Sequence, residues 1–273
     1  MTSFLMFTIQ APLASWGEIA VGEWRGSWDT PSRSAVIGLV GAALGVERSD
    51  TVLQAALRDG YRVAVRADRK GSAMQDYHTM QSVEQGIVKK RNLRTRASLW
   101  TVPKESRQTI LSRREYRQNV VHTVAVWSVG QAQWSLEDLA RSLERPVYAP
   151  FAGRRCNPLG LPMMPAVVDA DTLAGAFAQR KPIHDWCAGM LAMLKPSRPR
   201  AAGRNEDVQA DFESADRWGR EVAHDATEGF ESGCESTGTK IVRRRDVPLN
   251  RDGWLFSERG MVISQLPSVE GGT

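Results

Sequence analysis

The chain has 273 residues, of which 42% are hydrophobic and 25% are charged, and its formal net charge is +5. This ordinary hydrophobicity and small net charge exclude a chain that is mainly disordered. No run of about 18 apolar residues occurs, so we expect no transmembrane helix, and the apolar stretch at residues 4–9 is too short for a signal peptide.

The first half of the chain alternates between strand and helix patterns. Residues 3–10 are apolar on both faces and predict a central strand. Thr30 and Pro31 have the character of an N-cap and a first helical residue, and they predict a helix that ends at Gly45. A second helix is expected over residues 50–58, and a half-buried strand over residues 61–67.

The clearest later strand covers residues 120–129. Ser135 and Asp138 have the spacing of a capping box and predict a helix over residues 136–144, which a Pro- and Gly-rich stretch follows at residues 146–165. The order strand, helix, strand, long basic excursion, strand, helix is typical of the α+β class, and specifically of a ferredoxin-like domain.

Residues 166–273 are expected to form a C-terminal region beside a ferredoxin-like domain at residues 1–165. An acidic, apolar-poor stretch at about 181–236 suggests a surface insertion. Two short strands near residues 239–244 and 261–265 are expected to close the chain as a small β subdomain.

Charge is distributed unevenly along the chain. Residues 86–117 hold ten cations and two acids, a net charge of +8, whereas residues 204–235 hold three cations and ten acids, a net charge of −7. The basic segment could be only a solvated loop. Its richness in arginine, with Leu93, Trp100 and Tyr116 interspersed, favours binding to a nucleic acid.

Nucleotide, metal and disulfide sites find little support. Gly38, Gly41 and Gly45 match neither GxGxxG nor GxxxxGK[ST]. The three cysteines are far apart and form no CxxC pair, and the acids at 206–235 lack the spacing of a calcium loop. We therefore expect a cytoplasmic protein without a metal ion or other cofactor.

Several short motifs together resemble the Cas five family of the RAMP superfamily, which belongs to type I-E CRISPR Cascade complexes. They lie in the opening strand and at residues 11–17, 30–34, 38–45, 76–79, 114–116, 127, 148–155 and 259–265. The similarity covers about residues 1–165 and 237–265. The segment at about 181–236 departs from the family by its length.

The resemblance implies a ferredoxin-like, RRM-like domain with a long basic β-hairpin thumb at about residues 86–117. It implies a non-catalytic subunit in antiviral defence, which holds the 5′ handle of the crRNA and caps the backbone. The implied partners are that RNA, the backbone subunit (CasC), the large subunit (CasA) and, through the assembled complex, target DNA. No membrane contact is implied.

The candidate RNA-binding residues are cations suited to phosphate and one aromatic residue suited to stacking on a base. They are Arg33, Lys89, Lys90, Arg91, Arg94, Arg96, Arg113, Arg114, Arg117, Tyr148, Arg154 and Arg155. Arg33 is included because it lies in the first turn of a predicted helix, where free backbone N–H groups can bind phosphate. Tyr148 and its neighbour Phe151 could equally be core residues, and Trp16 is expected to be buried.

Two other function classes stay open. A metal-independent endoribonuclease would need a general base, for which His78 and His122 are candidates, beside the cations of the basic segment. His122 lies in an apolar strand, where a hydrogen-bonded structural role is expected instead, and the resemblance assigns the nuclease to another subunit. A basic DNA-binding regulator is disfavoured because no helix-turn-helix pattern occurs.

Overall fold

The computed structural model describes residues 1–180, 220–225, 232–250 and 255–267. Within these residues, nine strands form one sheet, and seven of them follow one another in a single antiparallel path. In spatial order these are β10 (Glu235–Asn250), β11 (Leu255–Gln265), β9 (Glu221–Asp225), β5 (Tyr61–Arg69), β7 (Arg107–Ser128), β1 (Thr2–Ala14) and β8 (Ala166–Ala170).

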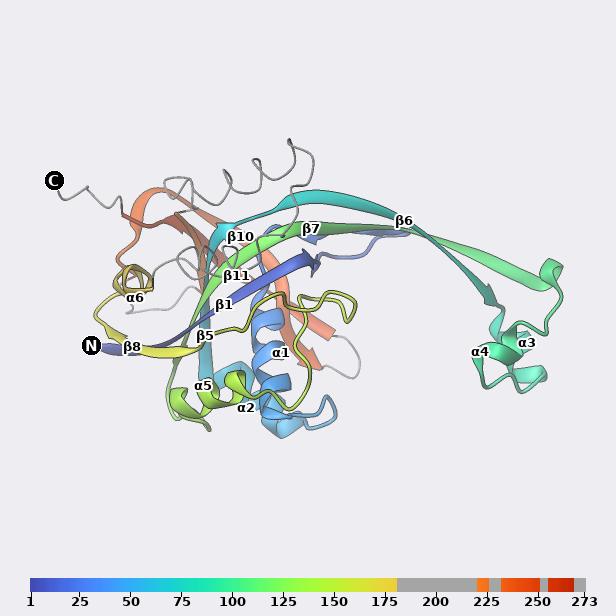
Figure 1. The fold of residues 1–273 in the computed structure, drawn as a ribbon, viewed down its shortest axis with the longest axis horizontal. Coiled ribbons are helices and arrows are strands. Elements are labelled where there is room, and N and C mark those ends of the chain that lie inside the picture. The colour runs from blue at the N-terminus through green and yellow to red at the C-terminus, as the bar shows by residue number, and fades with distance from the viewer. Residues whose placement is uncertain (181–219, 226–231, 251–254, 268–273) are drawn as a thin grey trace, which may run out of the picture.

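Helices cover both faces of the central strands (Figure 1). They are α1 (Arg33–Leu44), α2 (Thr51–Gly60), α5 (Leu136–Glu144) and α6 (Leu173–Gln179). Leu5, Phe7 and Ile9 of β1 pack in one core with residues of α1, α2 and α5. Phe4 and Met6 face the other way and pack in a second core with α6. The prediction of a central first strand, apolar on both faces, is confirmed.

Capping side chains fix where the helices begin. Ser135 and Asp138 form the predicted capping box of α5, with the Ser135 Oγ accepting from the Asp138 N–H at 3.1 Å. The predicted cap of α1 is wrong by two residues, because Ser32 accepts the Ala35 N–H at 3.1 Å. Thr30 is instead buried, and its carbonyl accepts a hydrogen bond from Arg244 at 2.8 Å.

A two-stranded ribbon projects from the sheet (Figure 1). It consists of β6 (Ser72–Val83) and the first part of β7, paired from Ser72 opposite Gln118 to Val83 opposite Arg107. Its far end, here called the tip, carries the short helices α3 (Gln85–Lys90) and α4 (Arg96–Leu99) and a 3-10 turn at Lys104–Ser106. The basic segment at 86–117 is therefore the tip plus part of β7.

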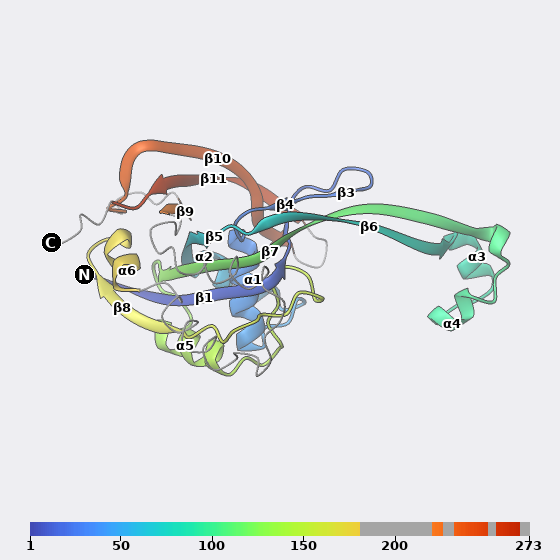
Figure 2. The ribbon, with the colours of Figure 1, turned by 45° about the horizontal axis from the view of Figure 1, so that its top comes forward.

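A short hairpin flanks the other side of the ribbon. Its strands β2 (Trp16–Gly17) and β4 (Ser27–Trp28) pair with each other, and Trp16 is buried as expected. Between them, β3 (Trp24–Arg25) runs parallel to β7 and pairs with it (Figure 2).

The C-terminal strands correct two expectations. They do not form a separate subdomain, because β9 pairs with β5 and so joins β10 and β11 to the central sheet. Residues 221–225 are not part of a surface insertion either, since they form β9 and the Val222 side chain is fully buried. Residues 235 and 236 of the predicted insertion begin β10, and its segments at 181–219 and 226–231 lie outside the described residues. No described helix is both long and apolar enough to cross a membrane.

Candidate nucleic-acid interface

The tip presents a group of exposed cations. Lys89 and Lys90 lie in the last turn of α3, where positive charge is favoured by the helix dipole, and Arg91 follows directly. Arg94 is exposed and donates from Nε to Asn92 Oδ1 at 3.1 Å. Arg96 begins α4. Four of the predicted binding residues are thus accessible at the far end of the ribbon.

Arg107 holds the tip together. Its guanidinium lies 4.8 Å from the centroid of the Trp100 ring, and it donates to the Val102 carbonyl at 2.9 Å and the Trp100 carbonyl at 2.8 Å. Val102 beneath it is almost fully buried. One cation of the basic segment is therefore used for local structure, because a guanidinium can stack and donate several hydrogen bonds at once.

Of the remaining predicted cations of β7, Arg113 and Arg117 lie on one face of the ribbon and Arg114 on the other, because successive strand residues alternate between faces. Arg113 is exposed, whereas Arg117 is partly buried and pairs with Glu115 at 3.3 Å. Arg114 donates to Ser112 Oγ at 3.2 Å. Arg25 of β3 lies next to Arg114 in register and adds a cation that the sequence analysis did not include.

A tight loop brings two more arginines to the base of the ribbon. The Arg154 guanidinium lies 4.6 Å from the centroid of the Tyr116 ring of β7, and Arg155 beside it is exposed. Gly153 has φ +83°, and a Cβ there would collide with the Ser15 carbonyl oxygen. The Ser15 N–H donates to the Ala152 carbonyl at 3.1 Å. Only glycine permits this close approach of the loop to the start of the hairpin.

The aromatic residues of the same loop are on the surface. Tyr148 is 47% exposed and Phe151 is 39% exposed, so the alternative that they are core residues is wrong. Tyr148 also lines a depression of about 510 Å³ beside the end of α1. The other lining residues are Gly38, Ala42, Val46, Glu47, Arg48, Ser49 and Gln54.

Arg33 is not at the surface, and its predicted contact with phosphate is wrong. It is 5% exposed, its Nε pairs with Asp225 Oδ2 at 3.0 Å, and Nη2 donates to the Tyr61 carbonyl at 2.8 Å. Burial lowers the pKa of its guanidinium below the usual value. Its backbone N–H, which was expected to be free, donates to Asp246 Oδ2 at 2.9 Å.

Arg259 completes this buried charge cluster. It pairs through Nη1 with Asp225 Oδ1 at 2.6 Å and through Nε with Asp246 Oδ1 at 2.7 Å. The cluster ties the first turn of α1 to β9, β10 and β11. Its two aspartates lie about two hundred residues after Arg33 in the chain, so no local pattern in the sequence indicates the pairing.

The three described histidines lie on three different strands. His122 of β7 is fully buried, and burial lowers its pKa to about 3. Its position in the core is as predicted, but neither ring nitrogen has a hydrogen-bond partner in the described structure. His78 is partly exposed on β6, and His224 of β9 is buried, with Nδ1 3.0 Å from the Asp225 carbonyl. His184 lies outside the described residues.

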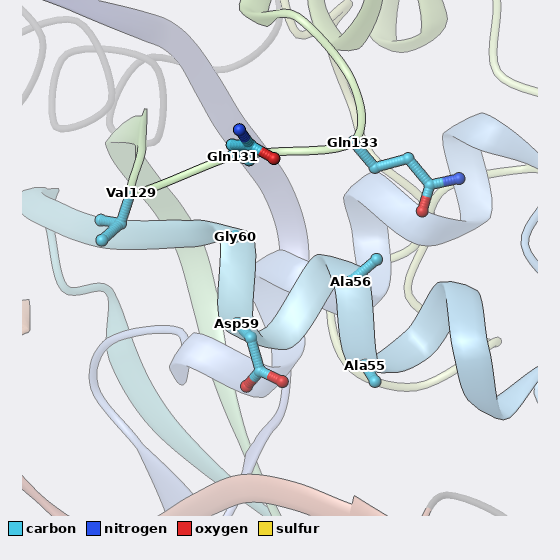
Figure 3. Close-up of a pocket in the computed structure, with 7 residues that line it drawn as sticks. All are labelled: Ala55, Ala56, Asp59, Gly60, Val129, Gln131 and Gln133. Carbon is cyan, nitrogen blue, oxygen red and sulfur yellow. The ribbon is translucent and has the colours of Figure 1, made fainter.

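A second depression, of about 430 Å³, lies between the end of α2 and the loop after β7 (Figure 3). It is lined by Ala55, Ala56, Asp59, Gly60, Val129, Gln131 and Gln133. Its lining includes none of the predicted binding residues. It is therefore separate from the basic surface.

Comparison with known proteins supports the family resemblance that the motifs indicate. Residues 4–225 match the family described as "CRISPR-associated protein (Cas_Cas5)". This chain belongs to the Cas five family. The resemblance inferred from the sequence is thus confirmed, and the matched range includes the whole ribbon and the Arg154 loop.

Three individual proteins are similar to this Cas five chain. It is 29% identical over 191 residues to the CRISPR system Cascade subunit CasD of Escherichia coli (strain K12), covering 67% of this chain and 79% of CasD. A chain of a CRISPR RNA-guided surveillance complex matches with a TM-score of 0.54 at 24% identity, over 96% of this chain and 90% of that chain. A crystal structure of a Cas protein matches with a TM-score of 0.50 at 19% identity, over 97% and 95%. These structural matches support the mixed α/β fold with a mainly antiparallel sheet.

Proposed function

We propose that this chain is the non-catalytic, RNA-binding Cas five subunit of a type I-E Cascade complex in the cytoplasm. In this role it holds the 5′ handle of the crRNA and caps the backbone next to the large subunit. The observation that carries the proposal is the set of exposed cations along the ribbon, with Arg154 and Arg155 at its base and the exposed rings of Tyr148 and Phe151 in the same loop as these two arginines. Cations and exposed rings together suit single-stranded RNA. The relationship to CasD supports the assignment to Cascade.

The ferredoxin-like architecture is part of the proposal. The order β5-β7-β1-β8, with a helix after β1 and another after β7 on one face, supports it. In this architecture the ribbon is the thumb, extended from the predicted residues 86–117 to include β6. It projects well beyond the sheet, which suits contact with a neighbouring backbone subunit, CasC, while CasA and target DNA would meet the chain in the assembled complex (Figure 2).

The absence of catalysis is likewise proposed. A general base must reach the 2′-hydroxyl of its substrate while it is able to take up a proton. His122 is fully buried and has a pKa of about 3, which makes it unsuitable for this role. His78 is more accessible, but the relationship to CasD favours a binding subunit over the endoribonuclease alternative.

A binding titration tests the role of the ribbon. Four ribbon arginines would be changed to glutamine together: Arg94, Arg96, Arg113 and Arg114. If all four contact phosphates, the slope of log affinity against log salt falls by about 3 for single-stranded repeat RNA, since each contact contributes roughly 0.7. The matched control is Arg141→Gln, an exposed arginine of α5 that pairs with Asp138 at 3.1 Å. A slope unchanged by the four substitutions would contradict the proposal.

A further inference from the structure

A predicted RNA-binding residue, Arg113, and two aromatic residues outside the predicted set form a row across the middle of the ribbon. Trp24 of β3 is in register with Arg113 of β7, and Arg113 is in register with Tyr77 of β6. Because β3 and β6 flank β7 on opposite sides, the three residues occupy neighbouring strands. Residues paired in this way project from the same face of a sheet. The row therefore reads aromatic, cation, aromatic.

All three side chains are accessible. Trp24 is 42% exposed and Tyr77 is 57% exposed, and Arg113 is also exposed. Within the described part of the chain, no hydrogen bond or ion pair occupies the Arg113 guanidinium. Large exposed aromatic side chains that gather in one place mark binding surfaces. This row thus has two free ring faces with an unpaired positive charge between them.

The row is held in place by the backbone. The Arg113 N–H donates to the Glu23 carbonyl at 2.9 Å, which fixes the register of β3 against β7. Gly26 leaves room for the Glu18 side chain and the indole, since a Cβ there would collide with Glu18 Oε2 and lie 3.0 Å from Trp24 Nε1. The Trp24 indole nitrogen and the Glu18 side chain therefore both lie beside the bare backbone of Gly26 in their own hairpin. Such support favours a preformed surface over a flexible loop.

We infer that Trp24, Arg113 and Tyr77 form a platform on which two unpaired bases of single-stranded RNA stack, with Arg113 binding the phosphate between them. Neighbouring strands lie about 4.8 Å apart, so the two aromatic residues are roughly 10 Å from each other, with the guanidinium midway. A base offers a π face to each ring whatever its sequence, and arginine suits phosphate. The inference rests on the proposed function and adds a second RNA contact to it.

The surrounding charge favours RNA over a protein partner. The segment that contains Arg113 has a net charge of +8. Glu115, two residues along β7 on the same face, is paired with Arg117 at 3.3 Å. Glu18 places one carboxylate beside Gly26 near Trp24, but the net charge of the ribbon segment is positive, which attracts a polyanion.

The test measures binding of a fluorescein-labelled oligouridylate to the full-length chain at several salt concentrations. Trp24→Ala and Tyr77→Ala should each weaken binding about fivefold or more while leaving the salt slope unchanged, because stacking releases no counterions. Trp24→Phe and Tyr77→Phe should restore most of the affinity. Arg113→Gln should instead lower the slope by about 0.7. Val52→Ala, at a 74% exposed apolar residue of α2 away from the ribbon, is the control and should bind like wild type.

A second arm uses the same oligouridylate annealed to its complement, whose bases are no longer free to stack. The aromatic variants should bind this duplex as wild type does. Wild-type affinity of both alanine variants for the single strand would overturn the platform and leave the proposed function standing. An equal loss of affinity for both probes would also overturn it. Failure of the wild-type chain to bind RNA at all would remove the proposed function and the platform together.

Discussion

The buried charge cluster at the start of α1 provides the sharpest test of the fold. Asp225 accepts hydrogen bonds from Arg33 Nε at 3.0 Å and from the Val63 N–H at 3.0 Å, and it forms an ion pair with Arg259 Nη1 at 2.6 Å. Asp225→Asn removes the negative charge and leaves the two guanidinium groups facing an amide. Breaking a buried ion pair from one side costs about 3–5 kcal/mol, because an uncompensated charge stays buried.

Urea denaturation followed by circular dichroism would measure this loss. A change of about 3–5 kcal/mol corresponds to a fall in melting temperature of roughly 6–20 °C for a chain of this size. The matched control is Asp171→Asn, which removes a carboxylate that is 78% exposed and pairs with the N-terminal amine. The control should change the free energy of unfolding by no more than about 1 kcal/mol. If Asp225→Asn were as stable as the control, the cluster would not hold α1 to the C-terminal strands.

Two further predictions concern the loop at the ribbon base and the buried histidine. Gly153→Ala should destabilise the loop by about 1–3 kcal/mol and weaken RNA binding, since φ +83° and the Ser15 carbonyl both exclude a side chain; wild-type melting and affinity would contradict this. His122 has a folded-state pKa of about 3, below its ordinary 6.5, so the unfolded chain takes up this proton first as the pH falls. Stability should therefore be lost below about pH 6.5 by up to roughly 1.4 kcal/mol per pH unit, and urea titrations of His122→Phe at pH 7 and pH 4.5 should show a shallower dependence than wild type. Equal pH dependence in the two proteins would show that His122 is not responsible.

Much of the fold follows from local signals in the sequence. The capping box at Ser135 located α5, and apolar residues on both faces located β1, because each pattern depends on neighbours a few positions away. The family motifs depend only on residue order, so they too could be recognised. The arginines of the ribbon were found by counting charge.

The predictions that are wrong or incomplete concern residues that pair with distant parts of the chain. β6 is mostly polar and exposed, so it carries no core pattern and becomes a strand only by pairing with β7. β9 lies among acids that were interpreted as surface, yet Asp225 is buried by two arginines from other elements. The sequence predicts Arg33 in the RNA site for the same reason, since Asp225, with which it pairs, lies nearly two hundred residues later. The row formed by Trp24, Arg113 and Tyr77 likewise exists only once three strands are in register.

Sequencing the RNA that copurifies with the tagged chain tests the central claim most directly. The chain would be expressed with its neighbouring subunits and a CRISPR array, in cells that lack the dedicated processing nuclease and in cells that retain it. A non-catalytic handle-binding subunit should retain only unprocessed transcript in the first cells and mature guides in the second. Mature guides with one uniform 5′ end in the absence of the nuclease would mean that this chain cuts RNA, and the account would be wrong.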